Sequence, residues 1–482
     1  SGNSSAGSRL CLHFGMAVRT LKLGSYLLCL LFSLSWATTD VSDFEFKHHN
    51  NLEVRDELWK VHRKCPNITK IYTLSETSVQ GHPIYVLVIS DYPEQHELLE
   101  PEFRYGANMH GNEVSGRETL LKLAHELCDL YLKKDAEVTR LVDTTKIYLI
   151  PTMNPDGWDM ASLTNGLEGR NNNNSVDLNR DFPDLDRIIY SNEKDHINKN
   201  NHVMEQLQYF SVQPETLGMM KLIMKYPFVL AANFHNGALV ANYPYDSSRS
   251  GAMQEYAKSP DDEVFKSLAR SYSTLHPYMG NPEFPGCDKN EDFSQKGGIT
   301  NGAKWYSVRG GMQDFSYLSS NALEITLEIG CTKFPDAKTL QQEWLDNRNS
   351  TINFIWQVHT GIKGVVTDAK TGSPISGASV HVRNVTQGRN EDINHDVTTV
   401  HSGDYWRLLT PGTYEVTLWA QGYLPSSKFV KVKNAPGTEA ARVDFSLLRP
   451  RRSIDEQYAR RRKASWNVYS LLRKENPFDT LY

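Results

Sequence analysis

The chain has 482 residues, which suggests two or three domains and leaves ample room for a hydrophobic core. Hydrophobic residues make up 39% and charged residues 23%, as is usual for a soluble globular protein. The formal net charge of −5 gives no reason to expect a nucleic acid or an anionic membrane as a partner, so neither is among the expected partners.

The first 37 residues are expected to be a leader that includes a signal peptide. Arg19 and Lys22 follow Met16, and after them come the apolar run YLLCLLFSL and the tripeptide SWA. Basic, apolar and small residues in that order are typical of a secretory signal peptide, here removed after Ala37. The alternative is a membrane anchor, but the apolar run is too short to span a bilayer. We expect a secreted or extracellular product of the secretory pathway, without a transmembrane segment.

Four cysteines remain after the leader, which itself holds Cys11 and Cys29. The four are Cys65, Cys128, Cys287 and Cys331. An even number of cysteines in a secreted chain suggests two disulfides, and three pairings are open. N-glycosylation sequons are compatible with the same compartment, and they begin at Asn67, Asn173, Asn349 and Asn384.

Residues 40–358 alternate apolar strand-type runs with helix-type segments. The runs include PIYVLVIS, KIYLIP, FVLAANF and ALEITL. Several are apolar throughout, which predicts strands buried on both faces in a mainly parallel sheet. Between the runs, helical spacing relates Leu120, Ala124, Leu127 and Tyr131. We predict an α/β domain with a mixed, mainly parallel sheet flanked by helices.

The pattern changes near residue 360, where short strand-type pieces alternate with Gly, Pro and Ser turns. In the piece GTYEVTLW, polar neighbours alternate with Tyr414, Val416 and Leu418, which is the period of a half-buried strand. We predict a small antiparallel, all-β sandwich over residues 360–448. The basic tail, residues 449–482, lacks a convincing apolar pattern and is expected to be flexible, with a proteolytic processing site as the alternative.

Four residues stand at or after the ends of strand-type runs, at positions suited to a metal site. A zinc hydrolase site needs three protein ligands and one open position for water. His110 and Glu113 lie in a polar turn between the apparent strand EFRYGA and an apparent helix. His235 follows the run FVLAANF, and Glu328 ends the run ALEITLE. Because sites in open α/β sheets gather beyond the carboxyl ends of strands, we expect these residues to converge on one crevice.

The His-x-x-Glu spacing does not establish a metal site by itself. With sixteen histidines, about one such pair is expected by chance, and a second pair exists at His202 and Glu205. That pair lies in the polar segment INKNNHVMEQLQ, away from any strand-type run. We therefore expect His202 to be a surface histidine rather than a metal ligand.

Further motifs accompany these residues in a defined order, namely NPDGW, Arg170, VDLNRDFPD and KWYSVRGGMQD. The ordered set resembles the zinc metallocarboxypeptidases of the regulatory (N/E) branch, which remove basic C-terminal residues. The resemblance covers residues 45–448, including the β-sandwich, which is similar to the transthyretin-like domain of that branch. Within the branch, the chain is most similar to the first catalytic unit of a multi-unit member.

The resemblance implies a complete catalytic site with one Zn²⁺ per catalytic domain. Its metal ligands would be His110, Glu113 and His235. Asp177 would orient His110 through a hydrogen bond. Glu328 would be the general base, and Arg170 would stabilise the oxyanion.

The resemblance also implies how a peptide binds. Asn179 and Arg180 would hold the free α-carboxylate, because a planar guanidinium can grip a carboxylate with two hydrogen bonds. Tyr306 would close over the same group. Asp246 and Gln313 would receive a Lys or Arg side chain, because an apolar side chain would leave the buried carboxylate unpaired. The expected partners are peptides and proteins that end in Arg or Lys, and the enzyme is expected to be monomeric.

Simpler roles compete with two of these assignments. An isolated Arg180 would most often be half of a surface ion pair. An isolated Asp246 would cap or solvate a loop. The neighbouring motifs favour the binding roles over both alternatives.

One departure from the family pattern concerns the cysteines. Relatives commonly have cysteines at the positions of Ala322 and Thr332, so one disulfide of the family is expected to be missing. The resemblance pairs the remaining cysteines as Cys287 with Cys331 and Cys65 with Cys128. None of the implied catalytic positions is altered, so the chain does not resemble an inactive member.

Three other functions are weighed against the enzyme. A catalytically silent relative that binds partners is expected to lack a metal ligand or the base, and all are present. A zinc-dependent deacylase on a related scaffold accounts neither for Tyr306 and the leader nor for the appended β-sandwich. The third alternative places the binding function in residues 360–448, which carry no charged or aromatic cluster. We expect the sandwich to support folding of the first domain instead.

Overall fold

A computed structural model describes residues 44–207, 210–284, 286–288 and 292–450. The predicted leader, residues 1–37, lies outside the described residues, and so does the tail from residue 451 onward. What we expect of these two segments therefore stays a prediction. In the part of the chain that is described, no helix is both long and apolar enough to cross a membrane.

The described strands of the first domain form one eight-stranded sheet in the order β1-β2-β4-β3-β5-β8-β6-β7. They are β1 Thr69–Thr77, β2 Pro83–Ile89, β3 Glu102–Ala107, β4 Lys146–Ile150, β5 Phe228–His235, β6 Ala238–Tyr243, β7 Ile299–Asn301 and β8 Leu323–Gly330. Four neighbouring pairs of these strands are parallel and three are antiparallel, which confirms a mixed, mainly parallel sheet. Every residue of β3, β5 and β8 is buried. Because side chains alternate between the two faces, both faces are covered there.

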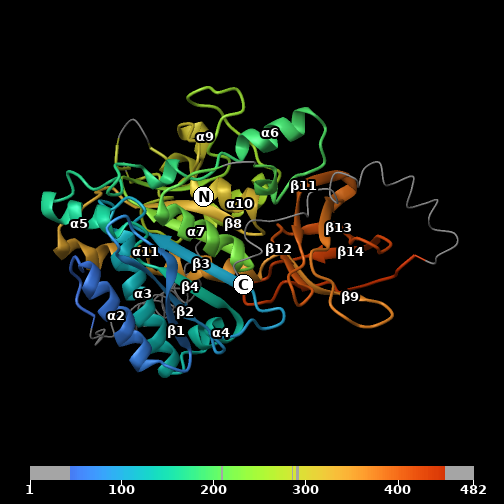
Figure 1. Ribbon diagram of the computed structural model, residues 1–482, viewed down its shortest axis with the longest axis horizontal. Helices are drawn as coiled ribbons and strands as arrows, with labels where there is room; N and C mark the ends of the chain where they lie inside the picture. Colours follow the sequence, from blue (N-terminus) through green and yellow to red (C-terminus); the bar gives the residue numbers. More distant parts are fainter. Residues whose placement is uncertain (1–43, 208–209, 285, 289–291, 451–482) are drawn as a thin grey trace, which may run out of the picture. The chain divides into compact units, whose positions relative to one another are not determined.

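Helices surround this sheet, as Figure 1 shows. Those described are α2 Asn51–Lys64, α3 Ser115–Leu132, α4 Ala136–Thr144, α5 Pro155–Thr164, α6 Asp186–Lys194, α7 Pro214–Lys225, α8 Asp262–Ser273, α9 Gly302–Trp305, α10 Met312–Ser319 and α11 Leu340–Trp356. Helix α3 packs against β3, β5, α2, α4 and α11, whereas α7 packs against β1 and α10 against β8. The helical spacing in α3 is confirmed, because Leu120, Ala124 and Leu127 are fully buried. Tyr131 is only partly buried, and its hydroxyl donates to Asp143.

The β-sandwich follows α11 and consists of two sheets, ordered β11-β10-β13-β14 and β12-β9-β15, with β16 also paired to β9. Its strands are β9 Ile362–Asp368, β10 Ser379–Asn384, β11 Glu391–Thr398, β12 Asp404–Arg407, β13 Gly412–Trp419, β14 Ser426–Val432, β15 Ala441–Arg442 and β16 Phe445–Leu447. The predicted alternation in β13 is confirmed, since Tyr414, Val416 and Leu418 lie in the core between the sheets. The sandwich is not wholly antiparallel, because the last two strands run parallel to β9.

A buried ion pair joins the sandwich to the α/β domain. Arg407 in β12 lies 2.8 Å from Oδ1 of Asp261, and both side chains are 0% exposed. The Tyr317 hydroxyl donates to the other oxygen of Asp261 at 2.8 Å. The Tyr317 ring also stacks on His395 of the sandwich, with 3.8 Å between ring centroids. Polar groups of each domain therefore have their partners in the other domain, and separating the domains would leave these groups unpaired.

The histidine of the second His-x-x-Glu pair differs from its prediction. His202 is partly buried rather than on the open surface. Its Nε2 lies 3.2 Å from Asn321 Oδ1 and 3.4 Å from Thr398 Oγ1. The local sequence could not show this environment, because Thr398 lies 196 residues further along the chain.

Both disulfides that the resemblance implied are present. Cys65 pairs with Cys128 across α2 and α3, and their Cα atoms are 6.0 Å apart. Cys287 pairs with Cys331 directly after β8, and their Cα atoms are 5.2 Å apart. Ala322 is fully buried and the exposed Thr332 follows Cys331, so the departure from the family pattern leaves both of these bonds intact.

The interdomain ion pair yields a stability prediction. Arg407→Ala should lower the free energy of unfolding by about 3–5 kcal/mol, because it leaves the Asp261 charge buried without its cation. Arg442→Ala is the matched control, since Arg442 is exposed and its pair with Asp444 lies on the surface, so a change within about 0.5 kcal/mol is expected. Urea unfolding followed by circular dichroism compares the two. Equal losses in both variants would contradict the structural role of the buried pair.

Candidate active site and metal centre

The turn between β3 and α3 positions the first two candidate ligands. Asn108 has a left-handed backbone conformation (φ 56°), which Asn tolerates better than most residues. Its side-chain amide donates to the backbone carbonyls of His110, Gly111 and Glu113 at 3.1, 2.9 and 3.2 Å. At Gly111, an added Cβ would lie only 2.0 Å from the backbone of Gly157. The local sequence thus builds a tight turn in which the His110 and Glu113 residues are each 3% exposed.

The register of the sheet brings two more candidates to the same place. Strands β3, β5 and β8 are parallel neighbours, so their carboxyl ends meet at one edge of the sheet. His235 is the last residue of β5 and lies directly opposite Glu328 of β8. Contrary to the prediction, Glu328 does not end its strand, because β8 continues to Gly330. The pairing with β5 nevertheless holds Glu328 beside His235.

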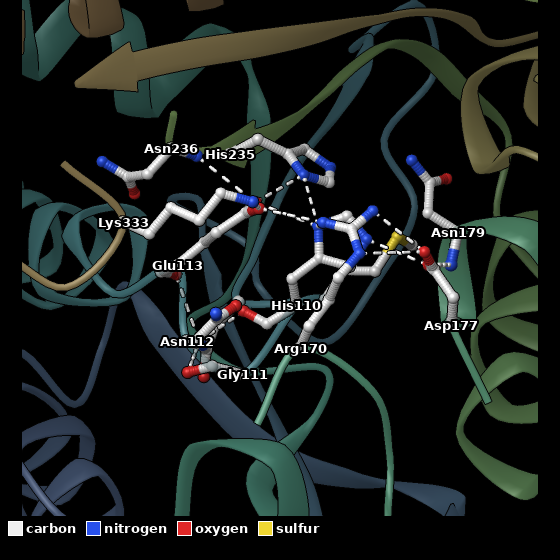
Figure 2. Close-up of polar contacts among 12 residues, drawn as sticks. His110, Gly111, Asn112, Glu113, Arg170, Asp177, Asn179, His235, Asn236 and Lys333 are labelled. Atoms are coloured by element: carbon white, nitrogen blue, oxygen red, sulfur yellow. Dashed lines mark hydrogen bonds and ion pairs between the residues drawn. The ribbon is translucent and has the colours of Figure 1, made fainter. Parts of the chain in front are cut away.

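The side chains of His110, Glu113 and His235 point toward one another, as Figure 2 shows. Oε2 of Glu113 lies 3.0 Å from Nδ1 of His110 and 2.8 Å from Nδ1 of His235. The two Nδ1 atoms are 3.1 Å apart. Two imidazole nitrogens and a carboxylate oxygen therefore form a nearly equilateral triangle of donor atoms.

This triangle fits a zinc ion. Two histidines and one glutamate are a known ligand set of catalytic zinc, and donors around tetrahedral zinc lie about 3.3 Å apart. The observed separations of 2.8–3.1 Å require only a small outward adjustment to reach that value. When both Nδ1 atoms are unprotonated, as ligation requires, their lone pairs face each other at 3.1 Å, and a cation between them offsets the repulsion.

Asp177 and Arg170 surround the candidate ligands. Oδ1 of Asp177 lies 3.0 Å from Nε2 of His110, which leaves Nδ1 of that ring directed at the other donors. Arg170 donates from Nε and Nη2 to Oδ2 of Asp177 at 3.1 and 2.9 Å, and its Nη1 lies 3.2 Å from Oε1 of Glu113. Burial alone would raise the pKa of Asp177, but the contacts with His110 and Arg170 lower it well below its usual value. The Asp177 carboxylate therefore stays ionised.

Glu328 has the opposite environment. The residue is 8% exposed, and its Oε2 has no hydrogen-bond partner among the described residues. Burial, together with the nearby charge of Glu113, raises the pKa of Glu328 well above its usual value. A buried carboxyl with an unpaired oxygen beside a metal site has the properties expected of a group that exchanges protons with a reactant.

Most of the predicted site residues line one cleft. Those in the lining are His110, Glu113, Arg170, Asn179, Arg180, His235, Asp246, Tyr306 and Glu328. The other two lie behind it, where Asp177 contacts His110 and Gln313 contacts Asp246. Segments more than two hundred residues apart in the chain thus meet in a single cleft.

One wall of the cleft suits a carboxylate. Arg180 is exposed and has no ion-pair partner in the described ranges, which argues against the alternative of a surface ion pair. Its Nη1 donates to the backbone carbonyl of Asn179 at 2.8 Å. The side chain of Asn179 is held in turn by the backbone N–H of Met312, which donates to it at 3.0 Å. Tyr306 follows α9 and is 43% exposed at the cleft.

The far end of the cleft holds a buried carboxyl. Asp246 is 5% exposed, and its Oδ1 accepts from Gln313 at 2.7 Å and from Asn242 at 3.2 Å. The backbone N–H of Asp246 donates to Asp314 Oδ2 at 2.6 Å. Burial raises the pKa of Asp246 to about 6. Asp246 contacts neutral amides rather than a cation, and it lines the cleft instead of capping an exposed loop.

Sequence reasoning missed three residues of the site. Lys333 lies in the cleft with its Nζ 3.0 Å from Oε1 of Glu113. Asn242 binds Asp246, and a Cβ added at Gly302 would lie 1.7 Å from Oδ1 of Asp246. Only Asn242 carried a signal, since it stands four residues before Asp246 in the strand that leads to the cleft. No motif singled out Lys333 or Gly302.

Comparison with known proteins agrees with this geometry. Residues 54–350 match the family described as "Zinc carboxypeptidase", and residues 361–448 match the "Carboxypeptidase regulatory-like domain". Carboxypeptidase E of Caenorhabditis elegans is 43% identical over 421 residues, covering 85% of this chain and 89% of that protein. Carboxypeptidase D of Rattus norvegicus is 45% identical over 412 residues, covering 84% of this chain but 27% of that protein.

A solved structure supports the fold alone. The crystal structure of thrombin activatable fibrinolysis inhibitor superposes with a TM-score of 0.50 at 17% sequence identity. The match covers 65% of this chain and 74% of that one. With a family match that spans most of the chain, the chain belongs to the zinc carboxypeptidase family and is a metallocarboxypeptidase of the regulatory branch.

Proposed function

We propose that this chain is a zinc-dependent carboxypeptidase of the secretory pathway that releases C-terminal Arg or Lys from peptides and proteins. The observation that carries the proposal is the presence, in one cleft, of the unpaired Arg180 and the buried Asp246. The first suits a terminal carboxylate and the second suits a cationic side chain. A C-terminal Arg or Lys carries both groups. Residues 40–358 would form the catalytic domain and residues 360–448 the transthyretin-like domain.

His110, Glu113 and His235 would hold the zinc ion. When bound, zinc polarises the scissile carbonyl and lowers the pKa of water at the open position. Asp177 would leave Nδ1 of His110 available to the ion, because it contacts the other ring nitrogen. Lys333 contacts Oε1 of Glu113, so the other oxygen, Oε2, remains beside the two histidines as the third donor atom.

Glu328 would act as general base and then as general acid. It takes a proton from the attacking water and delivers that proton to the leaving amine. The raised pKa of the buried Glu328 carboxyl supports the first step, since a more basic carboxylate accepts the proton from water more readily. Arg170 would stabilise the negative charge that develops on the carbonyl oxygen, because it lines the cleft and its guanidinium lies beside the candidate ligands Glu113 and His110.

The last residue of the substrate would bind through its two charged groups, the α-carboxylate and the basic side chain. Asn179 and Arg180 would hold the α-carboxylate, and Tyr306 would close over it from the mouth of the cleft. Asp246 and Gln313 would receive the basic side chain, because the desolvated carboxylate lacks a cation of its own. A substrate with an apolar last residue would leave that charge unpaired.

The secretory assignment is supported by features of the described chain as well as by the leader pattern. Two disulfides are typical of oxidising compartments. The sequon residues Asn67, Asn173 and Asn349 are exposed, so a glycan could be accommodated at each without entering the core.

Replacing a metal ligand and replacing the base should give different results. His235→Ala should lose bound zinc, because only two protein ligands remain. Glu328→Gln should keep about one zinc per chain and lose about 10²- to 10⁴-fold in kcat. Metal content by mass spectrometry and release of C-terminal Arg measure the two effects separately. Full zinc retention in the first variant, or near-normal kcat in the second, would contradict the assigned roles.

Arg180 should account for the requirement for a free chain end. Arg180→Met should lower kcat/KM by about 10²-fold, because a carboxylate loses its charged hydrogen bonds. The unmodified enzyme should not cleave a C-terminally amidated peptide. Arg187→Met is the control, since Arg187 is exposed on α6 outside the cleft and its loss should leave the rate unchanged. Cleavage of the amidated peptide at a comparable rate would argue against this assignment.

Asp246 should make selectivity depend on pH. Below its pKa of about 6 the carboxyl is protonated and no longer attracts a cation, so the ratio of kcat/KM for Arg-ending over Leu-ending peptides should fall as pH drops from 7.5 to 5. Groups common to both reactions cancel in this ratio. Asp246→Asn should have a low ratio that stays flat over the same range. A flat ratio in the unmodified enzyme, or faster cleavage of a Phe-ending than of an Arg-ending peptide, would contradict the proposal.

A further inference from the structure

Three carboxylates converge in the loop between β2 and β3, outside the active cleft. One oxygen from each of Asp91, Glu97 and Glu100 lies within 4.8 Å of the others. Glu100 is 7% exposed at the base of the cluster, whereas Asp91 and Glu97 are partly open to solvent. The Ser90 hydroxyl lies between two of them, 3.2 Å from Oε1 of Glu100 and 3.4 Å from Oδ1 of Asp91.

The buried carboxylate of this cluster is incompletely paired. Oε2 of Glu100 has no hydrogen-bond partner within the described ranges, although the atom is buried. An unpaired buried acceptor is costly, and native structures rarely retain one without an ion or water. Burial, reinforced by the charges of Glu97 and Asp91, raises the pKa of Glu100 to about 8. Without a cation, the surroundings of the cluster therefore disfavour its fully ionised form.

Two positive groups face the cluster, and both have other partners. The ammonium of Lys146 donates to the backbone carbonyl of Gln95 in the same loop. His96 lies 3.1 Å from Glu102 and 3.2 Å from Asp404. Neither group contacts the unpaired Oε2 of Glu100. Because both cations also bind other groups, they neutralise the three carboxylates only in part.

We propose that Asp91, Glu97 and Glu100 bind one Ca²⁺ ion. Calcium takes six to eight oxygen ligands with flexible geometry, and three carboxylates supply up to six oxygens. The Ser90 hydroxyl and water complete the shell. Magnesium requires a near-octahedral arrangement, which an irregular loop does not provide. The all-oxygen donor set also distinguishes this site from the nitrogen-containing zinc site, so each ion prefers its own location.

The loop that carries the cluster also contacts the β-sandwich. The backbone N–H of Leu99 donates to Asp404 Oδ2 at 2.8 Å. Lys363 of the sandwich donates to the carbonyl of Leu99 at 3.2 Å. An ion that cross-links residues 91–100 restrains the segment on which these contacts depend, so calcium stabilises the joined domains rather than taking part in the reaction.

The test uses the zinc-loaded full chain at pH 7.5. Equilibrium dialysis against radioactive calcium should give one Ca²⁺ per chain with a dissociation constant of about 10⁻⁴–10⁻³ M, the range of extracellular calcium modules. Calcium at 10 mM should raise Tm by roughly 2 °C, and the same concentration of Mg²⁺ should not. Glu97→Gln and Asp91→Asn should each weaken calcium binding at least tenfold. Both residues are partly exposed, so neither change is expected to prevent folding.

Glu94→Gln is the matched control, because Glu94 lies in the same loop but pairs with Lys70 outside the cluster. It should leave calcium binding unchanged. Without calcium, Glu97→Gln should be at least as stable as the unmodified chain, because it removes repulsion. If Glu97 had only a structural role, Glu97→Gln would instead lower Tm both with and without calcium. Unsaturable binding, binding unaffected by Glu97→Gln, equal loss in Glu94→Gln, or an equal Tm shift with Mg²⁺ would each overturn the proposal.

Discussion

The active site depends on the parallel alignment of β3, β5 and β8 at the centre of the sheet. Their carboxyl ends meet at one edge, so ligand atoms of residues that are far apart in the chain lie within 4.8 Å of one another around His235. The buried, fully paired strands form a rigid base, and the turn after β3 is held by Asn108. Donor atoms 2.8–3.1 Å apart can be maintained only on such a base, because a small shift separates them.

The cleft gives similar carboxylates different roles through their surroundings. Glu113 and Asp177 contact cationic side chains, which favour the ionised form that a metal site requires. Glu328 and Asp246 are buried among neutral groups or near like charge, and burial raises the pKa of each. Glu113 and Asp177 are therefore suited to remain ionised, whereas Glu328 is suited to exchange a proton and Asp246 to bind a cation. The chemistry follows from where each carboxylate lies, not from its type.

The β-sandwich is joined to the α/β domain by charged contacts as well as by apolar ones. Arg407 and Asp261 form a fully buried pair, and Asp404 accepts a hydrogen bond from the backbone of Leu99. Buried pairs of this kind define how two surfaces fit, because any other arrangement leaves a charge without its partner. The proposed calcium cluster lies in the loop that contains Leu99, so metal binding would act on the same contact.

The sequence by itself determined the main strands, helix α3 and the sandwich, because the spacing of apolar residues depends on neighbours a few residues apart. The order of its motifs also indicated the family. The sequence also identified residues at or just after the ends of strands, including His235 and His110. Only the tertiary structure decided which of them meet, that Glu328 lies within its strand, and that Lys333 contacts Glu113. Those facts depend on contacts between segments that are far apart in the chain, such as the pairing of β8 with β6 and the contact of Lys333 with Glu113, and a local sequence pattern does not specify such contacts.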